Sequence, residues 1–126
     1  MFKENKDLPL ESLQWNKMWD LWANGEALSP YQELMTYSAE INNGGHDQYF
    51  DNVSSSTDLS EAINQLYSIL KEPLKSNLKE AHDSYLKYDE FDDELSDILD
   101  ECDTVFYKNE EDLNDLLWEY AKSIET

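Results

Sequence analysis

The chain has 126 residues, enough for one domain, and hydrophobic residues make up 40% of it, too many for a disordered protein even at a net charge of −20. A single cysteine excludes an internal disulfide framework, and no stretch approaches the roughly 20 apolar residues of a membrane span. With 29 acidic residues against nine basic ones, direct binding to nucleic acid or to an anionic membrane is disfavoured, and a basic partner is favoured.

The first ten residues contain four charged side chains and no apolar run of the kind a signal peptide needs. We therefore expect a cytoplasmic protein. The first helix is predicted over residues 10–24, because Trp15, Met18, Trp19 and Trp22 share one helical face. This stripe has two interpretations, a contact with the protein's own core or a self-association face in a homodimer, since leucines widen the apolar band.

The second helix is predicted to start at the N-cap Ser29, with Pro30 in its first position, and to end at Gly44 with a positive φ. A short third helix is predicted over residues 46–53, and Asp58 has capping-box spacing for the fourth.

Three further helices follow, one opening at Pro73, one over residues 92–107 and one after the cap residue Asn109. The spacing of apolar residues is helical throughout. We therefore expect an all-α protein, a single compact domain over residues 1–126 with about six or seven helices.

The helix over residues 92–107 has an unusual charge distribution, because nine of the 15 residues from 89 to 103 are carboxylates and none is a lysine. At 100° per residue, seven apolar side chains share an arc of about 120°, and Asp92 and Asp103 fall with the other acids around the remaining circumference. Those seven side chains are Phe91, Leu95, Ile98, Leu99, Cys102, Val105 and Phe106.

The charge density along this segment is about one per 2.5 Å of helix axis, which approaches the one per roughly 1.7 Å of duplex DNA. Like charges three or four residues apart destabilise a helix, so this pattern lowers the stability of the helix. Solubility alone does not require such a pattern. Two interpretations stand, a solvated face and a surface for a basic partner. The residues expected to bind that partner are Asp89, Glu90, Asp93, Glu94, Asp97, Asp100 and Glu101.

No catalytic, metal or cofactor site is predicted. His46 and His82 lack the spacing that places two zinc ligands on one helical face, and Cys102 has no partner cysteine. Because Cys102 lies on the apolar arc, we expect a buried, inert thiol, and His82 is interpreted as a packed histidine at the edge of the core.

A tight helix–helix turn is the mechanical interpretation of the Asn-Gly-Gly segment. Gln48 is expected to bond back to the free backbone groups of the turn, and aromatic side chains are expected to fill the angle. A binding corner is the alternative. The residues of this structural motif are Asn43, Gly44, Gly45, Gln48, Tyr49, Phe50 and Asn52.

Glu40 and Ile41 precede this motif. Together they resemble the pattern of a bacterial domain family with a DNA-mimic member. His46 departs from that pattern, because the family usually has an apolar or aromatic residue at this position. The resemblance spans residues 31–121. It implies an all-helical, often self-associating domain whose carboxylates stand in for phosphates.

Three functions follow as hypotheses. The first is a non-enzymatic interaction protein, a DNA mimic that occupies the basic surface of a DNA-binding regulator or nuclease. The second is an immunity protein that neutralises a basic toxin such as a nuclease, and an uncharacterised structural domain is the plainest alternative. The third, an enzyme that uses carboxylates and a divalent metal, has no ligand spacing to support it.

Overall fold

Helices account for all the regular structure of the computed structural model, which describes residues 9–89 and 91–125. The all-α fold class predicted from the periodicity is confirmed. No helix in these two ranges combines the length and the apolarity needed to cross a membrane. The helices are α1 (Leu10–Ala23), α2 (Tyr31–Ser56), α3 (Leu59–Ile69), α4 (Leu74–Lys87), α5 (Asp93–Lys108) and α6 (Glu110–Lys122).

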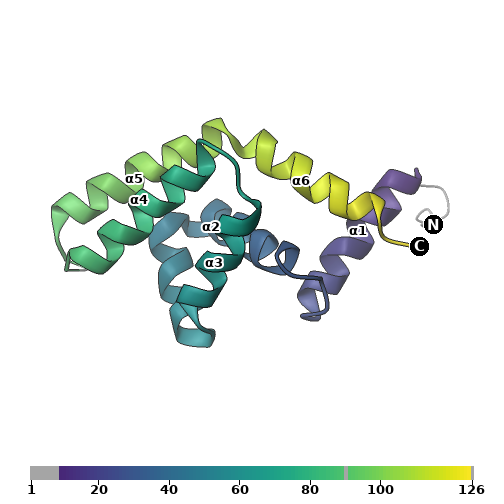
Figure 1. Ribbon diagram of the computed structural model, residues 1–126, viewed down its shortest axis with the longest axis horizontal. Coiled ribbons are helices and arrows are strands. Elements are labelled where there is room, and N and C mark those ends of the chain that lie inside the picture. The colour runs from purple at the N-terminus through teal and green to yellow at the C-terminus, as the bar shows by residue number, and fades with distance from the viewer. Residues whose placement is uncertain (1–8, 90, 126) are drawn as a thin grey trace, which may run out of the picture.

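The helices form an elongated, arched molecule (Figure 1). At one end α4 and α5 lie side by side as a hairpin, and α2 packs against both of them and against α3. From the end of α5, α6 runs to the opposite end of the molecule, where α1 lies against it. The acidic helix α5 is thus anchored on one side by α4 and on another by α2.

The core follows α2, which contacts α3, α4, α5 and α6. Its buried side chains are mainly leucine and aromatic, and they come from the faces that the helical periodicity predicts. The largest fully buried side chains are Tyr37, Tyr49, Phe50, Phe106, Met18, Leu34, Met35, Ile41, Ile63, Leu66, Leu78 and Leu113.

The helices predicted on either side of the Asn-Gly-Gly segment are both present, as the two halves of α2 that follow one another without a loop. The bend of α2 is at Gly45, with φ 81° and ψ −174°, so the prediction that Gly44 carries the positive φ is wrong. The ψ of Gly45 places it in a region of backbone conformation that is essentially reserved for glycine. Gly44 has a different constraint, because a Cβ there would collide with the side chain of Gln48.

Of the three predicted caps, Asp58 is confirmed, Ser29 is wrong, and Asn109 precedes α6 without a capping hydrogen bond from its side chain. Asp58 precedes α3, and its carboxylate accepts a hydrogen bond from the Glu61 backbone N–H at 3.3 Å. Ser29 is not the cap of α2, which begins two residues later, and its hydroxyl donates instead to Glu33 Oε2 at 3.0 Å.

Aromatic packing attaches α1 to α6. The indole of Trp15 stacks on that of Trp118 with ring centroids 4.1 Å apart, and Met18 is fully buried. Trp22 Nε1 donates to Thr36 Oγ1 of α2 at 2.9 Å. The tryptophan stripe therefore packs within the protein, although its indoles stay half-buried.

Candidate functional site

The acidic segment begins with a capped helix end. Asp92 is the N-cap of α5, and its carboxylate accepts from the Glu94 backbone N–H at 2.9 Å. Asp93 and Glu94 lie in the first turn, where the helix dipole stabilises negative charge. Phe91, predicted on the apolar arc, is 85% exposed instead. The helical arc does not reach it, because the backbone is extended at Asp92.

One face of α5 carries carboxylates that point to solvent. Within the helix they fall in an arc of about 120°, centred nearly opposite the buried arc, and follow one another at intervals of about 3 Å along the axis. Asp89, just before the helix, is also exposed, whereas Glu90 lies outside the described residues. We call the helical set the carboxylate band, and its members are Asp93, Glu94, Asp97, Asp100 and Glu101.

The opposite face of α5 is held firmly by the core. Leu95, Leu99, Cys102 and Phe106 are buried. The Cys102 carbonyl accepts a hydrogen bond from the side chain of Asn77 on α4 at 2.8 Å. Burial raises the pKa of the Cys102 thiol to about 12, with smaller contributions from nearby acids, so the expectation of a buried, unreactive thiol is confirmed.

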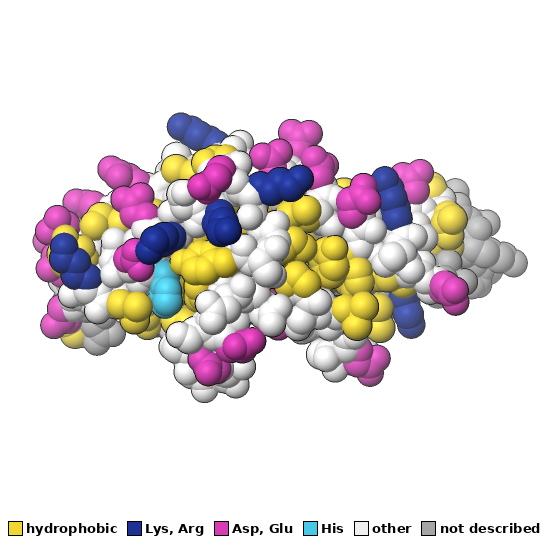
Figure 2. Space-filling view, in the orientation of Figure 1, with side chains coloured by type: hydrophobic (Ala, Val, Ile, Leu, Met, Phe, Trp, Pro, Cys, Tyr) yellow, Lys and Arg dark blue, Asp and Glu magenta, His cyan; other side chains and the backbone are white. Residues whose placement is uncertain are grey.

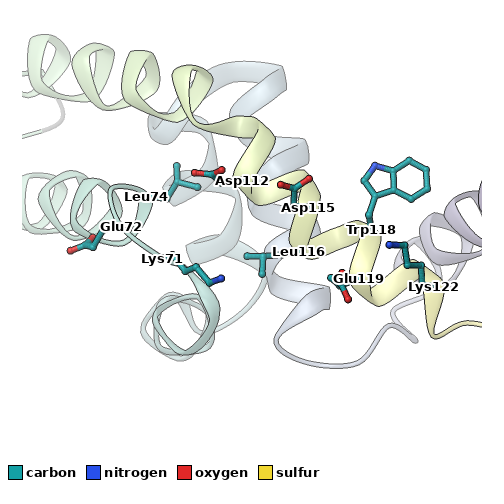
Figure 3. A pocket seen from close by; sticks show the side chains of 9 residues that line it. All are labelled: Lys71, Glu72, Leu74, Asp112, Asp115, Leu116, Trp118, Glu119 and Lys122. Carbon is teal, nitrogen blue, oxygen red and sulfur yellow. The ribbon is translucent and has the colours of Figure 1, made fainter.

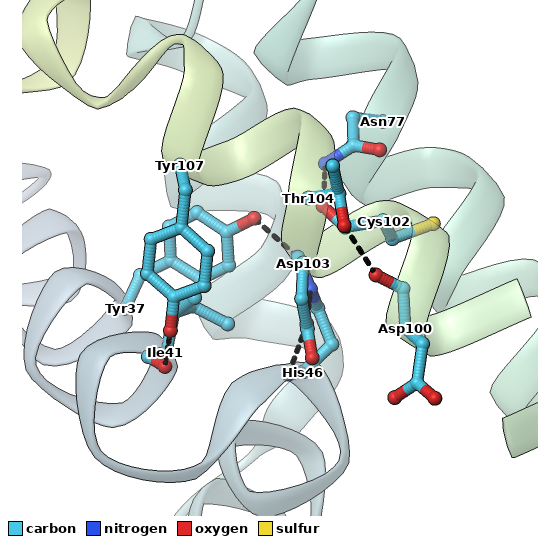
Figure 4. Close-up of polar contacts among 9 residues, drawn as sticks. All are labelled: Tyr37, Ile41, His46, Asn77, Asp100, Cys102, Asp103, Thr104 and Tyr107. Carbon is cyan, nitrogen blue, oxygen red and sulfur yellow. Dashed lines mark hydrogen bonds and ion pairs between the residues drawn. The ribbon is translucent and has the colours of Figure 1, made fainter. Parts of the chain in front are cut away.

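Asp103 does not belong to the exposed negative circumference where the sequence pattern placed it. It lies on the flank of α5 that faces α2, and its Oδ1 accepts from the His46 backbone N–H at 2.8 Å and from His46 Nδ1 at 2.6 Å (Figure 4). His46 Nε2 lies 2.6 Å from the hydroxyl of Tyr37. Periodicity could not reveal this contact, because 57 residues separate the two partners.

The Tyr37–His46–Asp103 chain ties α5 to the bend of α2. Although the three groups follow one another like a proton relay, His46 and Tyr37 are completely buried, and neither lines the groove beside α6 or the hollow between α2 and α3. Burial raises the pKa of the Tyr37 hydroxyl well above its ordinary value, with lesser contributions from Tyr49 and other groups. These side-chain hydrogen bonds therefore hold α5 against the bend of α2.

The band keeps its negative charge, because its carboxylates are not neutralised by ion pairs within the described residues. The ion pairs found there are His46–Asp103 and Lys79–Asp83, the latter at 2.9 Å within α4. Figure 2 shows acidic side chains gathered at the end formed by the α4–α5 hairpin, with scattered lysines among them on the visible face.

Acidic groups on α2 extend the negative region beyond α5. Asp47 and Asp51 follow the bend of α2, and both are exposed. Partial burial raises the pKa of Asp47, and the charges of Asp51 and Asp103 raise it further. Three carboxylates from two helices thus influence one another on this flank.

The motif around the bend has an outer and an inner side. On the outer side, the amides of Gln48 and Asn52 donate to Glu40 Oε2 at 3.0 Å and 2.7 Å, so Gln48 does not cap the backbone as expected. On the inner side, Tyr49 and Phe50 are completely buried and fill the angle, as predicted.

A groove of about 600 Å³ separates the α3–α4 connection from α6 (Figure 3). Its walls mix both signs of charge with apolar side chains, and no group of three His, Cys, Asp or Glu placed to hold a metal occurs among the described residues. The lining residues are Lys71, Glu72, Leu74, Asp112, Asp115, Leu116, Trp118, Glu119 and Lys122.

Fold and surface together define a small all-helical protein that displays a strongly acidic helix held by α4 on one flank and by α2 on another. The family model described as DMP19-like protein matches residues 31–124, so this chain belongs to the DMP19-like (DNA mimic protein 19) family, and the resemblance inferred from the motif is confirmed. The match includes α2 to α6 and leaves α1 outside. Comparisons with curated proteins and with solved structures found no match. Membership indicates a protein of the DNA-mimic type, generally non-enzymatic, that binds a DNA-binding protein.

Proposed function

We propose that this protein is a non-enzymatic DNA mimic whose carboxylate band, together with Asp89 and Glu90, occupies the basic DNA-binding surface of a bacterial regulator or nuclease in the cytoplasm. The observation that carries the proposal is the exposure of all five carboxylates of the band on one face of a helix whose other face is buried.

Charge density supports the comparison with DNA. The band has one negative charge per about 3 Å of helix axis, against one per roughly 1.7 Å in duplex DNA. A protein surface that neutralises phosphates with lysine and arginine can use the same side chains to pair with carboxylates. The band is short, about 12 Å between its first and last member, so it suits one cluster of basic residues.

Rigidity also supports the proposal. On one flank Asn77 of α4 binds the backbone of α5, and on the other Asp103 binds His46 of α2. Because these contacts hold the helix before a partner arrives, little ordering of the backbone is needed on binding. Exposed charges of one sign also steer a basic partner, so association should be fast and sensitive to salt.

Displacement of proteins from DNA-cellulose tests the proposal. Proteins of the native cell lysate are loaded on the resin in 100 mM salt, and the purified wild-type protein is then added to elute its partner. We expect selective elution of a DNA-binding protein, because the mimic and the DNA compete for one surface. The D93N/D97N/D100N/E101Q variant should elute little of it.

The matched control is the E11Q/D20N/E26Q/E125Q variant, which loses four exposed carboxylates on and around α1 and at the chain's end, outside the band. It should elute the partner as the wild type does. If both variants elute equally little, net charge alone is responsible, and if both elute as much as the wild type, the band is not the binding surface; either result contradicts the proposal. Elution of a toxin nuclease, with rescue of cells from that toxin, would identify the immunity function instead.

A further inference from the structure

A second hollow, of about 290 Å³, lies where α2 ends and α3 begins. No side chain of α5 lines it, so it is separate from the carboxylate band. Its walls contain three carboxylates, one amide and four hydroxyls, and no lysine. The lining residues are Gln32, Glu33, Thr36, Tyr49, Val53, Ser56, Thr57, Asp58, Glu61 and Ala62.

One wall of this hollow holds a buried hydroxyl that has no hydrogen-bond partner. Tyr49 is completely buried, and within the described residues its OH neither donates to nor accepts from another group. Burial raises the pKa of this phenol, and the nearby charge of Glu33 raises it further, so the group stays protonated. A buried polar atom without a partner is unfavourable, which makes it a candidate for contact with a ligand.

Glu33 supplies a second atom of the same kind. Its Oε2 accepts from the hydroxyl of Ser29 at 3.0 Å, whereas its Oε1 is buried and has no partner in the described part of the chain. Two oxygens without a hydrogen-bond partner thus line one hollow: Glu33 Oε1 is an acceptor, and the protonated Tyr49 hydroxyl can donate as well as accept. Asp58 and Glu61 add negative charge to the rim.

These features select the chemistry of the ligand. An anion is disfavoured by the three carboxylates, and a chelated metal is disfavoured because no three acidic or histidine side chains among the described residues converge on one point. A cation with several N–H donors fits the charge, the free Oε1 of Glu33 and the free lone pairs of the Tyr49 hydroxyl oxygen. The volume lies near the lower limit of ligand pockets, which suits one head group with a short tail.

We propose that this hollow, the α2–α3 pocket, binds the guanidinium or alkylammonium head of an organic cation, with N–H groups donating to Tyr49 OH and Glu33 Oε1. The same chemistry has two sources, a free small cation and the arginine or lysine side chain of a protein partner. The proposal is independent of the proposed function, because it involves no residue of the band.

Calorimetric titration of the purified protein with n-butylguanidinium in 150 mM NaCl tests the site. We expect saturable binding of one equivalent, together with NMR shift changes at Glu33, Tyr49 and Thr57. The Y49F and E33Q variants should each weaken binding at least tenfold. The neutral analogue n-butylurea should bind at least tenfold more weakly than the cation.

Two controls separate this site from general attraction to an acidic protein. The E119Q variant removes one exposed carboxylate that does not line the pocket, and the band variant D93N/D97N/D100N/E101Q removes four. Both should bind n-butylguanidinium within twofold of the wild type. Tight binding by the band variant, even if it no longer elutes a partner from DNA-cellulose, would show that the two sites are independent.

A second titration, with the peptide acetyl-Gly-Gly-Arg-Gly-Gly-amide, distinguishes the sources. Binding of the peptide supports a partner's arginine side chain, and binding of n-butylguanidinium alone supports a free small cation. Absence of saturable binding by both probes would overturn the proposal. Unchanged affinity in both Y49F and E33Q would overturn it as well.

Discussion

Asp100 and Asp103 lie less than one turn apart on α5 and have opposite roles. Asp100 is exposed in the carboxylate band, whereas Asp103 accepts two hydrogen bonds from the buried His46. A sequence pattern assigns both to the polar side of the helix. The difference appears only when α2 is packed against α5 and presents the bend to one flank.

Substitution of these two acids should therefore change stability in opposite directions. Asp103→Asn weakens a charge-assisted contact to a buried histidine, so the free energy of unfolding should fall by about 2 kcal/mol. Asp100→Asn removes like-charge repulsion and should leave it unchanged or raise it by a few tenths of a kcal/mol. Urea denaturation followed by circular dichroism measures both, and equal effects would contradict the assignment of Asp103.

The two glycines with positive φ offer a second comparison at this scale. Gly25 has φ 72°, and a Cβ there would meet nothing within 4 Å, whereas a Cβ on Gly45 would collide with the Asp103 carboxylate. Gly25→Ala should cost about 1 kcal/mol from backbone strain alone. Gly45→Ala should cost about 3 kcal/mol or more, since it adds the loss of the Asp103 contact to its strain.

The same denaturation experiment measures both glycine variants. If Gly45→Ala were no more destabilising than Gly25→Ala, Asp103 would not be docked on the bend as described. The sequence located this turn but assigned the positive φ to the wrong glycine. Two successive glycines both permit it, and the choice depends on the packing of Asp103, 58 residues further along the chain.

At the scale of the element, α5 is the helix that periodicity predicted best. Its buried and exposed faces follow from 3.6 residues per turn, whereas the cap at Asp92 was not predicted, because Asp92 was counted among the acids of the helix itself. Phe91 was wrongly assigned to the apolar arc, because the helical periodicity was extended to residues that precede the N-cap Asp92. The two helices predicted around the Asn-Gly-Gly segment are the two halves of α2, and the non-helical backbone of Gly45 separates them.

The band should also show a conflict between stability and binding. Asp97 has like charges three or four residues away at Asp93, Glu94, Asp100 and Glu101, and it lies beyond the first turn, where the helix dipole gives it little compensation. Asp97→Asn should raise the free energy of unfolding by about 1 kcal/mol, the sum of several small repulsions. It should weaken partner binding at the same time.

Asp93→Asn is the matched control for Asp97→Asn. Asp93 lies in the first turn of α5, so its substitution also loses a favourable interaction with the helix dipole, worth about 0.3–1 kcal/mol. We expect little or no gain in stability. Thermal unfolding of both variants at low salt checks the pair, and a destabilised Asp97→Asn protein would refute the repulsion argument.

At the scale of the whole molecule, the helical class and the position of most helices follow from local patterns, but their arrangement does not. The sequence shows that Trp15 and Trp118 are apolar, for instance, yet only the fold stacks them and brings α1 to the far end of α6. The sequence likewise predicted only that Tyr49 fills the angle between helices. It did not predict that the Tyr49 hydroxyl is buried without a hydrogen-bond partner in the described part of the chain. Long-range packing decides such details.

The central claim is that the carboxylates of α5 take the place of DNA phosphates on a basic protein. The most direct test is the affinity of the eluted partner for the wild-type protein, the D93N/D97N/D100N/E101Q variant and the E11Q/D20N/E26Q/E125Q control, measured from 50 to 300 mM salt. We predict that the band variant loses about 30-fold in affinity, at about 0.5 kcal/mol per ion pair, together with much of the salt dependence, while the control keeps both. Equal affinity and equal salt dependence for all three proteins would contradict the claim.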